Sequence, residues 1–461
     1  MQIEHYFARI GVDPLTAAFD DIPARGHGGR GMMSPGNEKN PKVGTFAEWG
    51  PKAFVENADA PFSLYLHTPY CSHRCSFCPF YINPGRPGFS GEYSAWLSRE
   101  IDDTARVLEP HFGSRKITTV FFGGGTPSDL NRDDLAKIIR QLHERFPITD
   151  DTEITVEGRI RGFTAEKAKA WVDAGANRFS LGVQSTHTEL RRKLGRLADR
   201  DEIRQILEGL YASGAVVIID LIYGFPGQTP EMLEDDIRFV AEETNIHGLD
   251  LYELKQFPGS PLAKAIESGR FPPAPDRAER GRMFGAATDL LNKYGFEHFT
   301  RKHWRRSKRE RSLYNRTATG ANDLVPFGSG AGGRIGSYGI SMHRTIEQYT
   351  ESIARGEKPI SSAMPMPPRP PVPSFRQRLS FTVEACALPA LEHFPETHRA
   401  SAQTILEQWE AAELLVPALP GEILNETAIS YRMTPAGVFW AEHLQGLLTM
   451  FTSMPVPSAA R

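Results

Sequence analysis

FSLYLHTPYCSHRCSFC, residues 62–78, joins a run of large apolar residues to three closely spaced cysteines. The apolar run is typical of a buried strand. Cys71, Cys75 and Cys78 follow it with the spacing C-x3-C-x2-C. Three thiolates this close together are able to ligate one metal centre from a single loop. The segment therefore predicts a buried strand that leads into a metal-binding loop.

Two kinds of metal centre are compatible with these cysteines. A structural zinc site needs four ligands, but Cys386 lies far along the chain, and His73 between two cysteines would strain so small a loop. A [4Fe–4S] cluster held by three cysteines leaves one iron without a protein ligand, and that iron is able to bind a substrate or cofactor. The spacing favours the cluster.

Downstream of the cysteines, β-rich runs alternate with segments of helical period as far as residue 258. Helix-start signals precede two of these segments, at Thr164 and Thr229. Repeated βα units imply an α/β fold with a parallel sheet and outer helices, and both a doubly wound sheet and a barrel fit the pattern. The expected strands are 63–67, 118–122, 153–157, 178–183, 216–223 and 249–254, and the expected helices are 93–108, 135–146, 165–174, 203–212 and 232–243.

The 461 residues correspond to about three domains. Residues 365–373 hold six prolines, a composition that favours an extended, semi-rigid linker. The predicted organisation is an N-terminal arm at 1–60 with a Gly- and Pro-rich loop at 26–44, a core at 61–260, an extension of the core at 261–360, a proline-rich linker at 361–376, and a small, mainly helical domain at 377–461.

Composition excludes several classes of protein. The 53 basic and 56 acidic residues give a net charge of −3, which provides no basic field for nucleic acid. No run of 18 apolar residues predicts a membrane span, and the N-terminus lacks the apolar stretch of a targeting segment. Four cysteines are too few for a disulfide scaffold of this size. We expect a cytoplasmic protein with reduced thiols.

The cysteine loop, with Phe77 before its last cysteine, resembles the signature of radical S-adenosylmethionine (SAM) enzymes. This resemblance implies a partial (β/α)6 TIM-like barrel, a [4Fe–4S] cluster and SAM as cofactors. In that family the open iron chelates SAM, and one electron from the cluster breaks a sulfonium C–S bond to give a 5′-deoxyadenosyl radical. The protein then holds SAM and substrate in register.

Further motifs resemble the HemN-like branch of this superfamily. SLYLHTPYC at 63–71 is similar to its opening, and FFGGGTP at 121–127 is similar to its glycine motif, in which backbone amides approach a ligand closely. The residues that the resemblance assigns to SAM binding are Tyr65, Phe77, Gly124, Gly125, Thr126, Glu157, Gln184, Arg196 and Asp220. Alternatives stay open for some of them: a surface ion pair for Glu157 or Arg196, and core packing for Tyr65.

Three members of the branch compete. Coproporphyrinogen III dehydrogenases carry a further cysteine where this chain has Phe80, and heme chaperones carry an HNxxYW-type motif that TRKHW at 300–304 lacks. The anaerobic heme-degrading radical SAM methyltransferases (ChuW/HutW) are similar in VDPLTAAF at 12–19, CPFY at 78–81 and RERSLYN at 309–315. That resemblance implies heme as substrate, ring opening to a linear tetrapyrrole with release of iron, and a low-potential electron donor such as flavodoxin or ferredoxin. The C-terminal segment resembles the small helical, winged-helix-like domain of the branch.

Heme-contacting residues are harder to identify. His298 and His303 are possible axial ligands, although a lone histidine is more often a surface residue. The glycine-rich stretch at 328–333 would admit a flat ligand or form a plain turn. Arginines between 301 and 311 are able to pair with propionates, but a solvated charged segment is the favoured interpretation; they are Arg301, Arg305, Arg306, Arg309 and Arg311.

Overall fold

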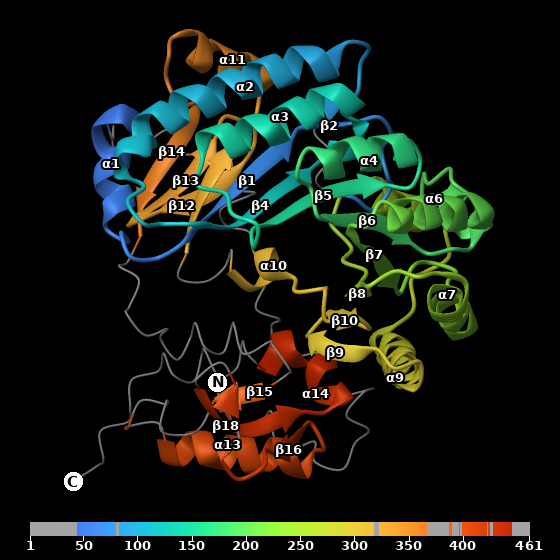
Figure 1. The fold of residues 1–461 in the computed structure, drawn as a ribbon. Helices are drawn as coiled ribbons and strands as arrows, with labels where there is room; N and C mark the ends of the chain where they lie inside the picture. The colour runs from blue at the N-terminus through green and yellow to red at the C-terminus, as the bar shows by residue number, and fades with distance from the viewer. Residues whose placement is uncertain are drawn as a thin grey trace.

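The structure is a computed structural model that describes residues 44–79, 83–317, 322–366, 387–389, 396, 399–421, 423–424 and 427–444. Outside these residues lie 26–43 of the predicted loop at 26–44, the position of Phe80, most of the proline-rich linker and Cys386. The α/β fold expected from the sequence is confirmed: a sheet with a parallel centre runs through the main body, with helices along one side (Figure 1).

Six parallel strands form the centre of this sheet, and each follows the preceding one in space as in sequence. All six match runs that the sequence predicts as strands. Because parallel strands share one carboxyl edge, residues at their ends meet on one side of the sheet. The strands are β1 (Phe62–Thr68), β4 (Ile117–Gly124), β5 (Glu153–Arg159), β6 (Arg178–Gln184), β7 (Val216–Tyr223) and β8 (Gly248–Glu253).

The connecting helices cover the outer side of the curved sheet (Figure 1). Two predicted start signals are confirmed, since Thr164 and Thr229 each accept a backbone N–H in the first helical turn. No helix within the described ranges is long and apolar enough to cross a bilayer. The helices are α2 (Phe89–Leu108), α3 (Arg132–Arg145), α4 (Ala165–Asp173), α5 (Thr188–Lys193), α6 (Arg200–Ala212) and α7 (Pro230–Glu243), with short 3-10 turns at Glu109–His111 and Pro127–Asp129.

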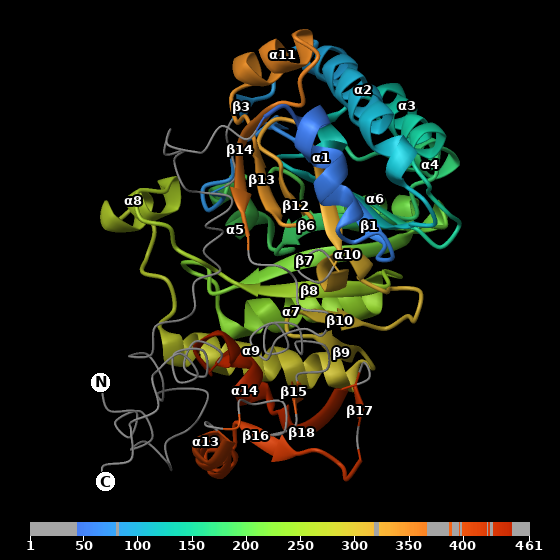
Figure 2. The ribbon, with the colours of Figure 1, turned by 90° about the vertical axis from the view of Figure 1, so that its left-hand side faces the viewer.

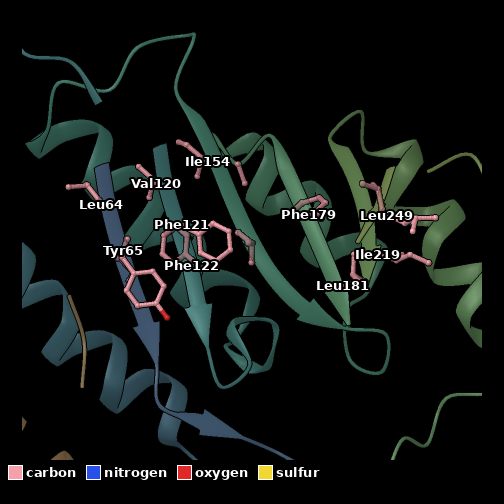
Figure 3. Close-up of a cluster of buried hydrophobic side chains, with 14 of the residues drawn as sticks. Leu64, Tyr65, Val120, Phe121, Phe122, Ile154, Phe179, Leu181, Ile219 and Leu249 are labelled. Carbon is pink, nitrogen blue, oxygen red and sulfur yellow. The ribbon is translucent and has the colours of Figure 1, made fainter. Parts of the chain in front are cut away.

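Successive side chains of the strands point to opposite faces of the sheet, which divides the core into two layers. Leu64 and Val120 are paired neighbours on β1 and β4, as are Tyr65 and Phe121, and the two pairs lie on opposite faces because successive side chains alternate (Figure 3). The first pair packs under the outer helices, and the second faces the interior of the curved sheet. Burial of this many large apolar side chains is the main force that holds the strands together.

The segment predicted to extend the core lengthens the sheet at both edges. One part pairs antiparallel with β8, and another begins with a strand parallel to β1. Its elements are α8 (Pro261–Glu267), α9 (Arg277–Lys293), β9 (Glu297–Thr300), β10 (His303–Arg305), α10 (Leu313–Thr317), β11 (Asp323–Phe327), β12 (Gly332–Ile335), β13 (Tyr338–Met342), α11 (Ile346–Ala354) and β14 (Ile360–Pro365). Helix α10 lies on the inner side of β4 (Figure 1).

Both ends of the described chain pack on this body. Helix α1 (Phe46–Val55) buries Phe54 against Phe62, so part of the predicted N-terminal arm belongs to the core. The described C-terminal residues form a small sheet beside their helices. The sequence analysis expected a mainly helical domain and did not predict these strands. Figure 2 shows α14 beside α9. The C-terminal elements are β15 (Ala387–Pro389), α13 (Arg399–Ala411), β16 (Leu415–Pro417), β17 (Ile423–Leu424), β18 (Thr427–Met433) and α14 (Pro435–Phe439).

Candidate functional site

The cysteine loop begins directly after the carboxyl end of β1. Strand β2 (Tyr70–Cys71) pairs with the short β3 (Asn83–Pro84) and carries the first cysteine. Cys71 and Cys75 are buried, Cys78 is partly exposed, and none of the three is part of a disulfide. The loop therefore presents three reduced sulfur ligands at the edge of the sheet where parallel α/β folds bind their ligands.

Neighbouring segments hold the backbone of this loop from several sides. Asp129 accepts the amide N–H of Ser72 at 2.6 Å, and Arg159 donates to the carbonyl of His73 at 2.7 Å. Further along, the amide of Ser76 donates to the carbonyl of Leu194 at 3.1 Å. The loop conformation is thus set by residues beyond the ends of β4 and β6 and by the last residue of β5, before any ligand is bound.

Thr126 links the glycine motif to the first cysteine. Its hydroxyl oxygen accepts from Arg159 Nε at 2.9 Å and lies 3.2 Å from Cys71 Sγ. A Cys71 thiolate that ligates a metal has no hydrogen of its own, so the Thr126 hydroxyl would then be the donor of this bond. Such a hydrogen bond orients a thiolate ligand and tunes the metal centre that it holds.

The arrangement favours a cluster over a zinc ion. Among the described residues, no three His, Cys, Asp or Glu side chains converge as the ligands of one ion. A cubane cluster takes one thiolate on each of three irons, so it does not need its cysteines to converge on one point. His73, the possible zinc ligand, is exposed and lies beside Ser72 Oγ at 3.2 Å.

The glycine motif supports the loop more than it offers free amides. Gly125 N donates to the carbonyl of Thr68 at 2.7 Å, and Thr126 N donates to the carbonyl of Tyr70 at 2.9 Å. A Cβ on Gly125 would stand 2.3 Å from the oxygen of Tyr70, so only glycine permits this close approach. Gly124 differs, because its backbone lies close enough to the Glu157 carboxyl group to lower the pKa of that group against the effect of burial.

Gln184 and Arg196 are brought together at the end of β6. Gly182 makes room for both, since a Cβ there would meet Gln184 Nε2 at 2.7 Å and an Arg196 nitrogen at 3.1 Å. Within the described part of the chain, Gln184 Oε1 and Arg196 Nε are buried without a hydrogen-bond partner. Buried polar atoms are rarely left unpaired, so this pair fits a ligand that supplies both a donor and an acceptor.

Two carboxyl groups stand beside this pair on the neighbouring strands. Glu157 lies on β5, and burial raises its pKa to about 7, with a backbone hydrogen bond from Gly124 opposing the shift. Asp220 on β7 is the register partner of Asp250 on β8. Burial, and then the charges of Asp250 and Glu157, raise the pKa of Asp220. Carboxyl groups at strand ends suit the hydroxyl groups of a bound ligand.

The raised pKa of Glu157 predicts that the free energy of unfolding of the ligand-free protein depends on pH. Its pKa rises from 4.5 to about 7 on folding, so the native state binds the extra proton between these values and stability falls as the pH rises through them. We expect Glu157→Gln to gain up to about 3 kcal/mol over the wild type between pH 5 and pH 8. Thermal melting of both proteins across that range measures the difference.

Glu208→Gln, which changes an exposed glutamate on α6, is the matched control and should melt in parallel with the wild type at every pH. A constant offset between Glu157→Gln and the wild type at pH 5 and pH 8 would contradict the assignment of the titration to Glu157.

Aromatic residues line the inner side of the sheet near these carboxyl groups. The ring of Tyr65 stacks with Phe121 and with Tyr314 of α10, and Phe121 and Tyr314 have their centroids 3.9 Å apart. The hydroxyl of Tyr65 lies 3.0 Å from His67 Nδ1. Phe77 lies apart from this stack, where Arg196 is 5.8 Å from its ring centroid. Tyr65 and Phe77 therefore belong to two sides of the site.

The five arginines of the 301–311 run all pair with protein groups, although Arg309 is exposed and Arg311 is partly exposed. These pairings give no support to propionate binding, which the sequence analysis did not favour. His303 is buried with Nδ1 3.0 Å from Asp250 Oδ1, and His298 stacks on Trp304. The partners are Glu442 for Arg301, Glu297 for Arg305, backbone carbonyls for Arg306 and Arg309, and Asp151 for Arg311.

The sequence interpretation missed several residues that shape the site. Arg159 and Asp129 hold the cysteine loop, and Tyr314 reaches the inner face from a helix far along the chain. Arg159 ends a strand next to the predicted Glu157, which is the one local signal that pointed to it. The others lie outside any motif, so only the packing of distant segments brings them to the site.

Comparisons with known proteins agree with this geometry. The profile of the radical SAM superfamily matches residues 65–240. The chain is 36% identical over 401 residues to an anaerobilin synthase of Escherichia coli O157:H7, covering 86% of each protein. It is 29% identical over 298 residues to the heme chaperone HemW of Bacillus subtilis, covering 63% of this chain and 76% of that one.

A solved structure shares the fold over nearly the full length. The coproporphyrinogen III oxidase HemN of Escherichia coli, described as a radical SAM enzyme, superposes with a TM-score of 0.71. The superposition covers 90% of this chain and 96% of that one at 21% identity. At that identity the likeness concerns the fold, including the segments beyond the six parallel strands.

Proposed function

The chain belongs to the radical SAM superfamily, and from this premise we propose that it opens the heme ring without oxygen. In this proposal a SAM-derived methyl or methylene group is transferred to the porphyrin, which opens to a linear tetrapyrrole and releases its iron. The observation that carries the proposal is the 36% identity to an anaerobilin synthase over 86% of both chains. The resemblance of the motifs to the heme-degrading group points to the same activity.

Cys71, Cys75 and Cys78 would hold three irons of a [4Fe–4S] cluster in this enzyme. When bound, the reduced cluster supplies the electron that cleaves SAM, so that one of the superfamily's cofactors becomes a source of radicals. The protein's own part is to hold the loop that carries the three thiols in one conformation. The hydrogen bonds of Ser72, His73 and Ser76 to neighbouring segments support that role.

SAM would bind between the cysteine loop and the carboxyl ends of β5, β6 and β7. Arg196 is a fixed donor group suited to the carboxylate of SAM, and Gln184 Oε1 is an acceptor suited to a ribose hydroxyl. Glu157 and Asp220 add carboxyl oxygens for the same hydroxyls. The unpaired state of Gln184 Oε1 and Arg196 Nε in the described structure supports this placement.

The substrate side of the site would be marked by Tyr314, whose ring stacks on Phe121, while Tyr65 beside them keeps the role in SAM binding that the resemblance gives it. A porphyrin is a large apolar plane, and stacked aromatic rings are suited to contact it. The enzyme also needs a low-potential electron donor, such as a flavodoxin or ferredoxin, and a reducing, oxygen-free compartment such as the cytoplasm.

A heme chaperone is the second candidate function, and the 29% identity to HemW is the observation in its favour. Incubation of the full-length, cluster-reconstituted protein with reductant, SAM and heme under nitrogen separates the two. We expect loss of the Soret band and a methylated linear tetrapyrrole by mass spectrometry. Heme that stays bound with an unchanged Soret band would overturn ring opening and favour the chaperone.

A further inference from the structure

The backbone of Gln184 adopts a conformation that its residue type disfavours. Its φ angle is 74°, in the left-handed region where a side chain meets the backbone. The strand register shifts between Gly182 and Gln184, so the chain turns away from the sheet here. Such strained residues persist where surrounding structure holds them, and they gather at functional sites.

Arg191 of α5 holds the chain on both sides of this residue. Its Nη1 donates to the carbonyl of Val183 and, at 2.7 Å, to the carbonyl of Ser185. Its Nε donates to the carbonyl of Ala198 at 2.7 Å. One guanidinium therefore ties the strand end that carries Gln184 to the loop that follows Arg196.

The charge of Arg191 makes these bonds strong. The side chain is 2% exposed, and burial followed by the nearby Arg196 lowers its pKa to about 10, which leaves it protonated at neutral pH. Hydrogen bonds from a charged donor are stronger than those between neutral groups, and more so away from water. All three acceptors of these bonds are backbone carbonyls, so the guanidinium fixes the course of the chain rather than forming a surface ion pair.

A second buried side chain holds the backbone just beyond the carbonyls that Arg191 binds. Asp236 of α7 accepts both the amide and the hydroxyl of Thr186 at 2.6 Å. Arg191 and Asp236 together fix residues 183–186, and the backbone of Arg191 accepts the amide of Arg196 at 2.8 Å. Gln184 and Arg196 are thereby placed by the same short segment.

We propose that Arg191 is a positioning residue for SAM binding, which holds Gln184 in its left-handed conformation and so aims its amide at the ligand. The inference rests on the proposed function, because it takes SAM as the ligand of Gln184. Arg191 itself touches no ligand in this account. It acts through the carbonyls of Val183 and Ser185.

The test compares Arg191→Met and Arg191→Lys with Arg192→Met, which changes the exposed neighbour on the same helix. In the full-length, reconstituted protein we expect both Arg191 variants to raise the Kd for SAM about 10- to 100-fold, with the lysine variant nearer the wild type. Arg192→Met should bind as the wild type does. In the ligand-free protein, amide hydrogen exchange should quicken at residues 183–198 in the Arg191 variants only.

Repeating the Arg191 substitutions in a Gln184→Gly protein separates the positioning of Gln184 from a general loss of structure around the site. Glycine adopts a φ of 74° without strain, so in Gln184→Gly the loss of Arg191 should change the already weakened SAM affinity less than about twofold. An equal fold-loss in both backgrounds would overturn the proposal, as would unchanged exchange at 183–198. Global unfolding of both Arg191 variants would also contradict the proposal, because Arg191 would then be needed for the stability of the whole fold.

The experiment gives different results if the proposed function is wrong and if only the role of Arg191 is wrong. A wild-type protein that does not bind SAM at all would sink the proposed function, while the exchange measurement on the ligand-free protein still judges whether Arg191 holds residues 183–186. A wild-type protein that binds SAM, with Arg191 variants that bind it equally well, would remove this inference alone.

Discussion

Replacing Cys75 with alanine is expected to abolish both cluster assembly and SAM cleavage. Cys75 is 6% exposed and lies between two other thiols of the loop, so its loss leaves two protein ligands for a centre that needs three. After anaerobic reconstitution, the variant should lack the brown colour, the iron and the sulfide of the wild type. SAM cleavage by the reduced protein should fall below detection.

Cys386→Ala is the matched control, because it removes a thiol outside the motif and should leave iron content and SAM cleavage as in the wild type. Circular dichroism checks that Cys75→Ala still folds, which we expect because backbone hydrogen bonds such as Ser76 to Leu194 hold the loop. A Cys75→Ala protein that still cleaves SAM would refute the cluster assignment. Binding of one zinc ion in place of iron would do the same.

The second large effect concerns stability and follows from a buried ion pair between the core and its extension. Arg178 on β6 donates to both carboxylate oxygens of Glu310, with Nε 2.9 Å from Oε2, and the two side chains are 3% and 0% exposed. Glu310→Ala leaves the guanidinium buried without its partner. We expect a loss of about 3–5 kcal/mol in the free energy of unfolding.

Urea denaturation of the ligand-free protein measures this loss, with Asp173→Ala as the control. Asp173 pairs with Lys169 on the surface of α4, where exposed pairs contribute little, so its loss should leave the transition nearly unmoved. The double variant Arg178→Met with Glu310→Leu should recover much of the lost stability, because neither charge of the pair is then left buried without the other. A Glu310→Ala protein as stable as the wild type would contradict the role of the pair.

The same pair predicts sensitivity to acid. Burial raises the pKa of Glu310, but the charges of Arg178 and His303, together with hydrogen bonds from Arg178 and Ser312, outweigh it, and the net shift of the pKa is downward. A carboxyl group whose pKa is lowered by folding stabilises the native state above its ordinary pKa, and this contribution is lost as the pH falls through the folded value. Acid below the ordinary range of glutamate should therefore loosen the contact between β6 and the segment before α10.

Local pattern was enough to predict the centre of the fold. The six strands and the helices between them follow from hydrophobic period and from start signals such as Thr164, which act within a few residues of the chain. The cysteine loop and the residues at strand ends follow for the same reason. Parallel strands share one edge, so Glu157, Gln184 and Asp220 had to meet once the βα order was known.

What the sequence by itself determined is therefore the order of elements, the cysteine loop and the polar residues at the strand ends. The tertiary structure decided the partners of the charged residues. Arg191, Arg196 and the arginines of the 301–311 run are the same residue type, yet Arg191 holds a strand end, Arg196 keeps a buried Nε without a hydrogen-bond partner in the described structure, and the others join distant segments. A guanidinium pairs with water, carboxylate or carbonyl through the same donors, so its role depends on which distant segment packs against it.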